Sequence, residues 1–90
     1  MAQVENDTLR NCILNTISYL FLHSSFISQK RFLEMIQEHT HLFTKKIELI
    51  QDTQKSVFTL NIDFGDVQLS YTLLYHINET SNAFVIDKID

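Results

Sequence analysis

Apolar and polar residues alternate most clearly in the C-terminal half of the chain, on both sides of its single glycine. If Gly65-Asp66 is a two-residue turn in which Gly65 supplies a positive φ, facing positions have residue numbers that sum to 131. One face then pairs apolar side chains, such as Phe58 with Leu73, and the other pairs polar ones, such as Asn61 with Ser70. A slip of one residue would destroy this separation. The pattern therefore predicts an antiparallel hairpin with strands at about 56–64 and 67–77.

The same alternation predicts one more strand on each side of this hairpin. After it, a four-residue loop at 79–82 allows a strand at about 83–89, with Ile77 facing Phe84 and Tyr75 facing Ile86.

Before the hairpin, a loop at 52–55 allows a strand at about 46–51, with Leu49 facing Phe58 and Ile47 facing Leu60. Continuing the preceding helix instead would place Lys46 within its apolar arc and Leu49 on its polar face. A strand is the favoured interpretation of 46–51, and a helix is the alternative.

The N-terminal part of the chain has helical spacing. Asn6 or Asp7 can cap a helix over about 7–23, whose apolar side chains cover roughly 220° of its circumference, against ~100° for an ordinary surface helix. This width predicts a helix buried on two sides, with Cys12 as a small buried hydrophobe at the edge of the arc.

A second helix is expected over about 28–43. Ser28 is a suitable N-cap, and Ile27 and Phe32 have the spacing of a hydrophobic staple. Apolar residues share one face only, so this helix should pack on one side and end between His39 and Thr44.

These elements predict one α+β domain over residues 1–90, since a chain this short supports a single core. Two N-terminal helices should pack on one face of a four-stranded, or at least three-stranded, antiparallel β-meander in the order ααββββ.

Composition narrows the setting. The single cysteine permits no internal disulfide, and no export signal or membrane-spanning stretch is visible, so we expect a cytoplasmic, reducing location without membrane binding. The scarcity of Gly, Ala and Arg suggests AT-rich coding DNA. The net charge of −4 falls entirely in residues 56–90, which argues against nucleic-acid binding through that third.

Catalytic motifs are not visible. The sequence contains no Gly-rich phosphate loop, nucleophile elbow or paired-carboxylate motif, so no cofactor and no enzymatic activity are expected. The alternative is a metal-dependent enzyme that uses His39, His41 and His76.

The central register also leaves apolar side chains on the polar face of the sheet. Val57 faces Leu74, and Val85 and Ile89 should lie on the neighbouring strand. Such a patch is typical of an association surface. Its expected rim consists of Thr59, Thr72, His76 and Asp87.

The last strand is predicted to be a free edge, which is a second possible contact. We therefore expect a non-catalytic protein–protein interaction module that forms a homodimer through the outer sheet face or this C-terminal edge. The alternative is a small acidic inhibitor or immunity-type protein that binds a cationic target surface through Asp63, Asp66 and Glu79.

Overall fold

The computed structural model describes residues 2–40 and 44–90. Its elements follow one another along the chain as α1 (Ala2–Phe21), β1 (Ser25–Phe26), α2 (Gln29–Thr40), β2 (Lys46–Asp52), β3 (Val57–Asp63), β4 (Gln68–Ile77) and β5 (Phe84–Ile89).

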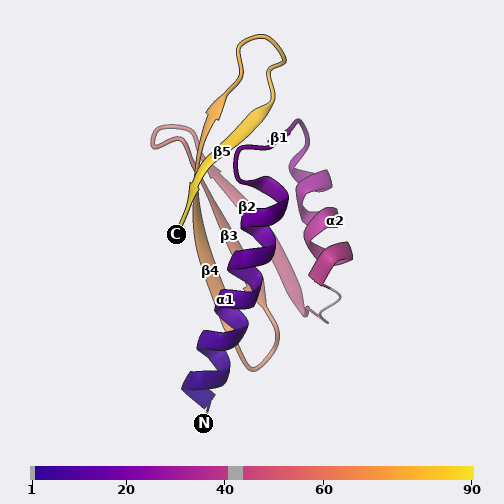
Figure 1. Ribbon diagram of the computed structural model, residues 1–90, viewed down its shortest axis with the longest axis vertical. Coiled ribbons are helices and arrows are strands. Elements are labelled where there is room, and N and C mark those ends of the chain that lie inside the picture. The colour runs from indigo at the N-terminus through magenta and orange to yellow at the C-terminus, as the bar shows by residue number, and fades with distance from the viewer. Residues whose placement is uncertain (1, 41–43) are drawn as a thin grey trace.

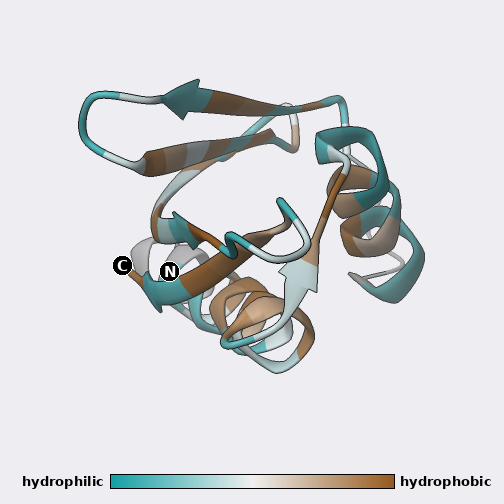
Figure 2. Cartoon of the chain, turned by 90° about the horizontal axis from the view of Figure 1, so that it is seen from above, coloured by the Kyte–Doolittle hydropathy of each residue, from teal (hydrophilic) through white to brown (hydrophobic). Residues whose placement is uncertain are grey.

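The five strands form one antiparallel sheet in the order β1-β5-β4-β3-β2. Both helices lie on the same side of this sheet (Figure 1). Seen along the long axis, the strands curl into a half-barrel beside the two helices (Figure 2). The predicted α+β class, with two helices on one face of an antiparallel meander, is confirmed, and β1 is an addition to it.

The central hairpin has the predicted register. Val57 faces Leu74 and Asp63 faces Gln68, with every pair between them in step. Gly65 has a φ of 97°, and the Phe64 N–H donates to the Val67 carbonyl at 2.8 Å to close the turn. The separation of apolar and polar faces therefore identified both the strands and their pairing.

Residues 46–52 form the favoured strand, but their predicted register is wrong by two residues. Leu49 faces Leu60, not Phe58, and Ile47 faces Ile62. The turn starts one residue later than expected because the Asp52 carboxylate accepts the Gln54 and Lys55 N–H groups at 3.0 and 3.1 Å. A shift of two keeps each side chain on its predicted face.

The pairs Ile77–Phe84 and Tyr75–Ile86 are confirmed, but a β-bulge follows them. The register shifts between Leu74 and Tyr75, so that Lys88 faces Leu74 and Ile89 faces the buried Leu73. One extra residue on a strand reverses the facing of the residues after it. Ile89 therefore packs against the core, which corrects its predicted place on the outer face.

The C-terminal strand is not the free edge that the sequence predicted. β1 pairs with it through Ser25–Val85 and Phe26–Phe84, and the His23 N–H donates to the Ile86 carbonyl at 2.8 Å. The element order is consequently αβαββββ. Two residues are too few to show alternation, so β1 could not be predicted from the hydrophobic pattern.

Helix α1 differs from its prediction in extent and burial. It begins at Ala2 rather than near residue 7 and ends at Phe21. Its described side chains are buried on one side only, since Tyr19 is 87% exposed and Cys12 is also exposed. This contradicts the prediction of a helix buried on two sides and the predicted burial of Cys12. In a domain of two layers a helix meets the sheet on one side only, however wide its apolar arc.

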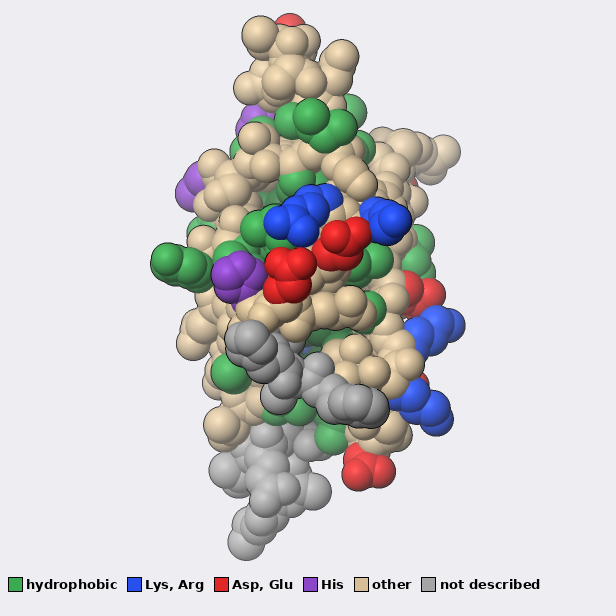
Figure 3. Space-filling model, turned by 90° about the vertical axis from the view of Figure 1, so that its right-hand side faces the viewer, with side chains coloured by type: hydrophobic (Ala, Val, Ile, Leu, Met, Phe, Trp, Pro, Cys, Tyr) green, Lys and Arg blue, Asp and Glu red, His purple; other side chains and the backbone are tan. Residues whose placement is uncertain are grey.

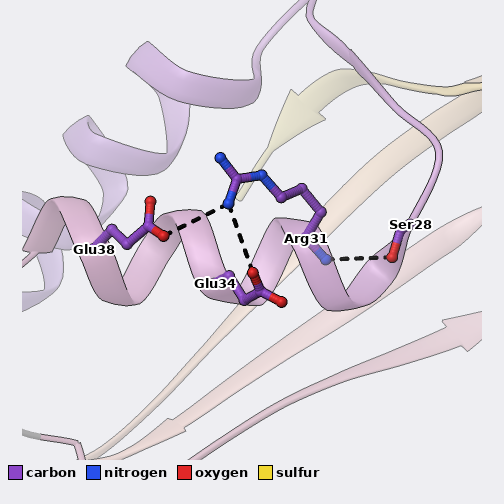
Figure 4. A network of polar contacts seen from close by, with 4 residues as sticks. All are labelled: Ser28, Arg31, Glu34 and Glu38. Carbon is purple, nitrogen blue, oxygen red and sulfur yellow. Dashed lines mark hydrogen bonds and ion pairs between the residues drawn. The ribbon is translucent and has the colours of Figure 1, made fainter.

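Helix α2 starts as predicted, with the Arg31 N–H donating to Ser28 Oγ at 3.3 Å. The Arg31 guanidinium also lies 3.6 Å from Glu34 and 3.5 Å from Glu38 on the exposed face (Figure 4). Ile27 is 76% exposed, so the expected staple with Phe32 is not formed. The helix ends at Thr40, and the predicted residues 41–43 lie outside the described part of the chain.

The core lies between the helices and the inner face of the sheet. Part of it is a cluster of aromatic rings that joins α1, β1 and α2 to the sheet. Within this cluster the rings of Phe21 and Phe32 are stacked, with 3.9 Å between their centroids. The rings in contact are Phe21, Phe26, Phe32, Phe58, Tyr75 and Phe84.

Candidate functional site

The face of the sheet that points away from the helices carries a short apolar strip. Val57 and Leu74 face each other on β3 and β4, and Ile50 on β2 is the diagonal neighbour of Val57 because it pairs with Thr59. Leu74 is 38% and Ile50 51% exposed. We call Ile50, Val57 and Leu74 the outer strip.

The rim of the outer strip is polar. Thr59 and Thr72 face each other beside it and are half-buried. His76 Nδ1 lies 2.8 and 2.9 Å from the two carboxylate oxygens of Asp87, which is the extra residue of the β-bulge. This exposed pair closes the end of the strip nearest the 79–82 loop.

The structure brings together only part of the predicted apolar patch. Val57 and Leu74 face each other on neighbouring strands. Val85 on β5 faces His76 instead of the strip, and Ile89 packs against the core on the inner face. Ile50 replaces Ile89 as an exposed apolar member. Its position could have been found from the sequence, because inward-facing Ile47 and Leu49 require Ile50 to face outward.

A polar depression of about 330 Å³ lies at the other end of the same face. Ser70 Oγ donates to Asn61 Oδ1 at 2.8 Å, Asn61 Nδ2 donates to Glu48 Oε1 at 3.4 Å, and Lys46 Nζ is 3.9 Å from Glu48. The polar groups of the depression therefore bind one another, and no buried side-chain N or O atom in the described residues lacks a partner.

Asp63 borders this depression next to the Gly65 turn. The Gly65 backbone N–H donates to Asp63 Oδ1 at 2.7 Å, and this bond lowers the pKa of the carboxyl below its usual 3.8. The Gln68 side chain at 3.2 Å and the charges of Lys45 and Lys46 act in the same direction. The carboxylate of Asp63 thus stabilises the turn.

The acidic residues expected to act together do not meet. Asp63 and Asp66 lie at the turn between β3 and β4, whereas Glu79 lies in the loop after β4. The ten residues of β4 separate the two turns by roughly 30 Å. The turns are at opposite ends of the molecule (Figure 1).

The histidines are also dispersed. His39 is in the last turn of α2, His76 is on the outer face of β4, and His41 lies outside the described residues. Over the described ranges, no three His, Cys, Asp or Glu side chains are grouped so that they could hold a metal ion.

Tyr71 on β4 is the buried polar side chain that connects the sheet to α1. Its hydroxyl donates to the Arg10 carbonyl at 2.9 Å, and the Arg10 guanidinium lies 4.7 Å from the ring centroid. Burial raises the pKa of this phenol to about 12, against a smaller opposing effect of the Arg10 charge. At neutral pH Tyr71 is a structural hydrogen-bond donor.

The side of the molecule formed by α2 and β2 carries bases and acids interleaved, without a continuous basic patch (Figure 3). Phosphate binding needs clustered Lys and Arg, and the described residues of this face show no such cluster. No helix in residues 2–40 and 44–90 has the length and apolar character needed to cross a membrane.

Comparison of the chain with protein families, curated proteins and solved structures finds no match.

Proposed function

We propose that this protein is a non-catalytic protein–protein interaction module that works in a reducing compartment and assembles as a homodimer. The observation that carries the proposal is the outer strip, three apolar side chains on the sheet face opposite to the one that α1 and α2 cover. Exposed apolar groups on a small sheet are costly in water and gain free energy when a partner covers them.

The electrostatics of the face agree with a protein contact. The strip is bordered by threonines and by the mutually bonded His76–Asp87 pair, so a partner would meet an apolar centre with a polar rim. This is the usual anatomy of a protein interface. The acidic-inhibitor alternative has less support, because Asp63 and Asp66 lie far from Glu79.

The test is the oligomeric state of the Leu74→Glu variant. Leu74 faces Lys88 within the sheet, so the new carboxylate has a cation beside it and the fold should tolerate it. Covering this carboxylate and Lys88 with a partner removes both charges from water, which is unfavourable, and we expect the dimer dissociation constant to rise at least about tenfold. Light scattering over a concentration series in reducing buffer measures this change.

Ser70→Glu is the matched control, since it adds the same charge to the same face of β4 outside the strip. It should dimerise like the unchanged protein. A protein that is monomeric at all concentrations, and whose behaviour Leu74→Glu does not alter, would remove the basis of the proposal.

A further inference from the structure

Among the described residues, nothing pairs with the outer side of β2, which is a long edge of the sheet. β2 is the last strand in the sheet order, and among the described residues its seven positions pair only with β3. The opposite edge is different, because β1 and His23 cover β5 at residues 84–86. The open strand contains neither proline nor glycine, and open edges of this kind readily accept another strand.

The hydrogen bonds of the central hairpin show which β2 groups face outward. Phe64 bonds Val67 and Ser56 bonds Tyr75, so the even-numbered positions of β3 direct their backbone groups to β4. Its odd-numbered positions therefore direct theirs to β2, where they meet the even-numbered residues. The N–H and C=O groups of Ile47, Leu49 and Gln51 consequently point away from the sheet.

We infer that β2 pairs antiparallel with β2 of a second copy of the chain, about a two-fold axis at Leu49. Leu49 would pair with its own counterpart and Ile47 with Gln51 of the partner subunit. All seven residues of the strand are then used, and the outward groups form about six backbone hydrogen bonds.

Charge selects this register. It places Lys46 opposite Asp52 of the partner subunit, twice by symmetry, and Glu48 opposite the apolar Ile50 of the partner subunit. Sliding the pairing by two residues one way sets Glu48 against its own counterpart. Sliding it the other way sets Glu48 against Asp52 of the partner subunit. Like charges directly opposite one another destabilise a sheet.

The pairing also enlarges the surface described above. Ile50 lies close to the two-fold axis on the outer face, so the outer strips of the two copies would run into one another across it. The inference rests on the proposed function in assuming self-association, and it names the edge through which self-association occurs.

Amide hydrogen exchange by NMR tests the pairing within a single strand. In reducing buffer, the amides of Ile47, Leu49 and Gln51 should exchange more slowly as protein concentration rises from the monomeric to the dimeric range. The amides of Glu48, Ile50 and Asp52 bond β3 in both states and serve as the internal control. A dimer in which the three outward amides stay unprotected overturns the inference.

A charge-coupling experiment tests the register. Lys46→Glu should raise the dimer dissociation constant at least about tenfold, because it sets two carboxylates opposite each other at both ends of the joint. Adding Asp52→Asn, which keeps a side-chain acceptor for the turn, should recover part of the loss. Within one chain the two positions are roughly 20 Å apart, so such recovery reports a contact between copies.

Lys30→Glu on α2 is the control for net charge and should leave dimerisation unchanged. A dimer that is weakened by Leu74→Glu but not by Lys46→Glu overturns the edge pairing and supports the proposed function. A chain that remains monomeric throughout overturns both.

Discussion

Tyr71 shows how one side chain can hold two layers of this fold together. Its ring is buried in the sheet, yet its hydroxyl reaches the Arg10 carbonyl of α1 and its face meets the Arg10 guanidinium. A buried phenol is stable only in its neutral form, which explains the rise of its pKa to about 12. The contact between α1 and β4 therefore depends on that proton.

The sign of the pH effect follows from the neutral form. The pKa in the folded state lies above the usual 10.0, so this contribution to stability is complete below pH 10 and is lost as the pH rises from 10 through about 12. At pH 8, the free energy of unfolding of Tyr71→Phe should be about 0.5–1.5 kcal/mol below that of the parent. Between pH 8 and pH 11, the free energy of unfolding should decrease less in Tyr71→Phe than in the parent. Urea unfolding at both pH values measures this.

Tyr19→Phe is the control, since Tyr19 is exposed on α1. Ultraviolet titration of the folded protein adds a direct readout, because the late phenolate signal should vanish in Tyr71→Phe. An equal loss of stability in parent and Tyr71→Phe at pH 11 would contradict the assignment.

At the scale of elements, pairings that follow from local alternation could be predicted, whereas those that depend on a loop contact or a bulge could not. The β3–β4 hairpin was predictable because Gly65 and eight residues of alternation on each side agree on one register. The β2–β3 register was not, since it depends on a side chain, Asp52, bonding the loop backbone. The bulge at Asp87 was also hidden, because β5 is too short for alternation to reveal an extra residue.

Gly65→Ala tests the turn that sets the central register. Apart from Gly65 and its two chain neighbours, no described atom lies within 4 Å of the position that a Cβ would occupy, so the cost comes from the positive φ. We expect a loss of about 1–2 kcal/mol in the free energy of unfolding. Chemical denaturation measures it, with Asp66→Ala in the same turn as the control. Unchanged stability would mean that the turn does not require a left-handed residue.

At the scale of the molecule, the two-layer arrangement could be predicted, but the covering of the sheet edges could not. β1 owes its place to Phe26, whose ring fits among Phe21, Phe32, Phe58 and Phe84, and such a fit depends on residues distant in sequence. The members of the candidate surface that depend on local pairing could be predicted, and the member that depends on the β-bulge could not. Val57 and Leu74 follow from local pairing, whereas Ile89 was redirected by the bulge.

Phe26→Ala tests the covering of β5. Removing a buried aromatic ring typically costs about 3–5 kcal/mol, and here the same change should release β1 from the edge. We expect a lower melting temperature together with concentration-dependent aggregation, seen by circular dichroism and light scattering. Ile27→Ala, at the exposed neighbouring position, should change neither. A destabilised Phe26→Ala that stays free of aggregates would show that β5 is protected in another way.

The short strand β1 thus has an effect far larger than its two residues suggest. A sheet with two open edges is a bifunctional monomer and can grow into a fibre, as a polymer grows from units with two reactive ends. With β5 covered at Phe84 to Ile86, strand addition at β2 leaves no second long edge in the described part of the chain. If β2 pairs with a second copy as proposed, growth by strand addition would stop at two copies.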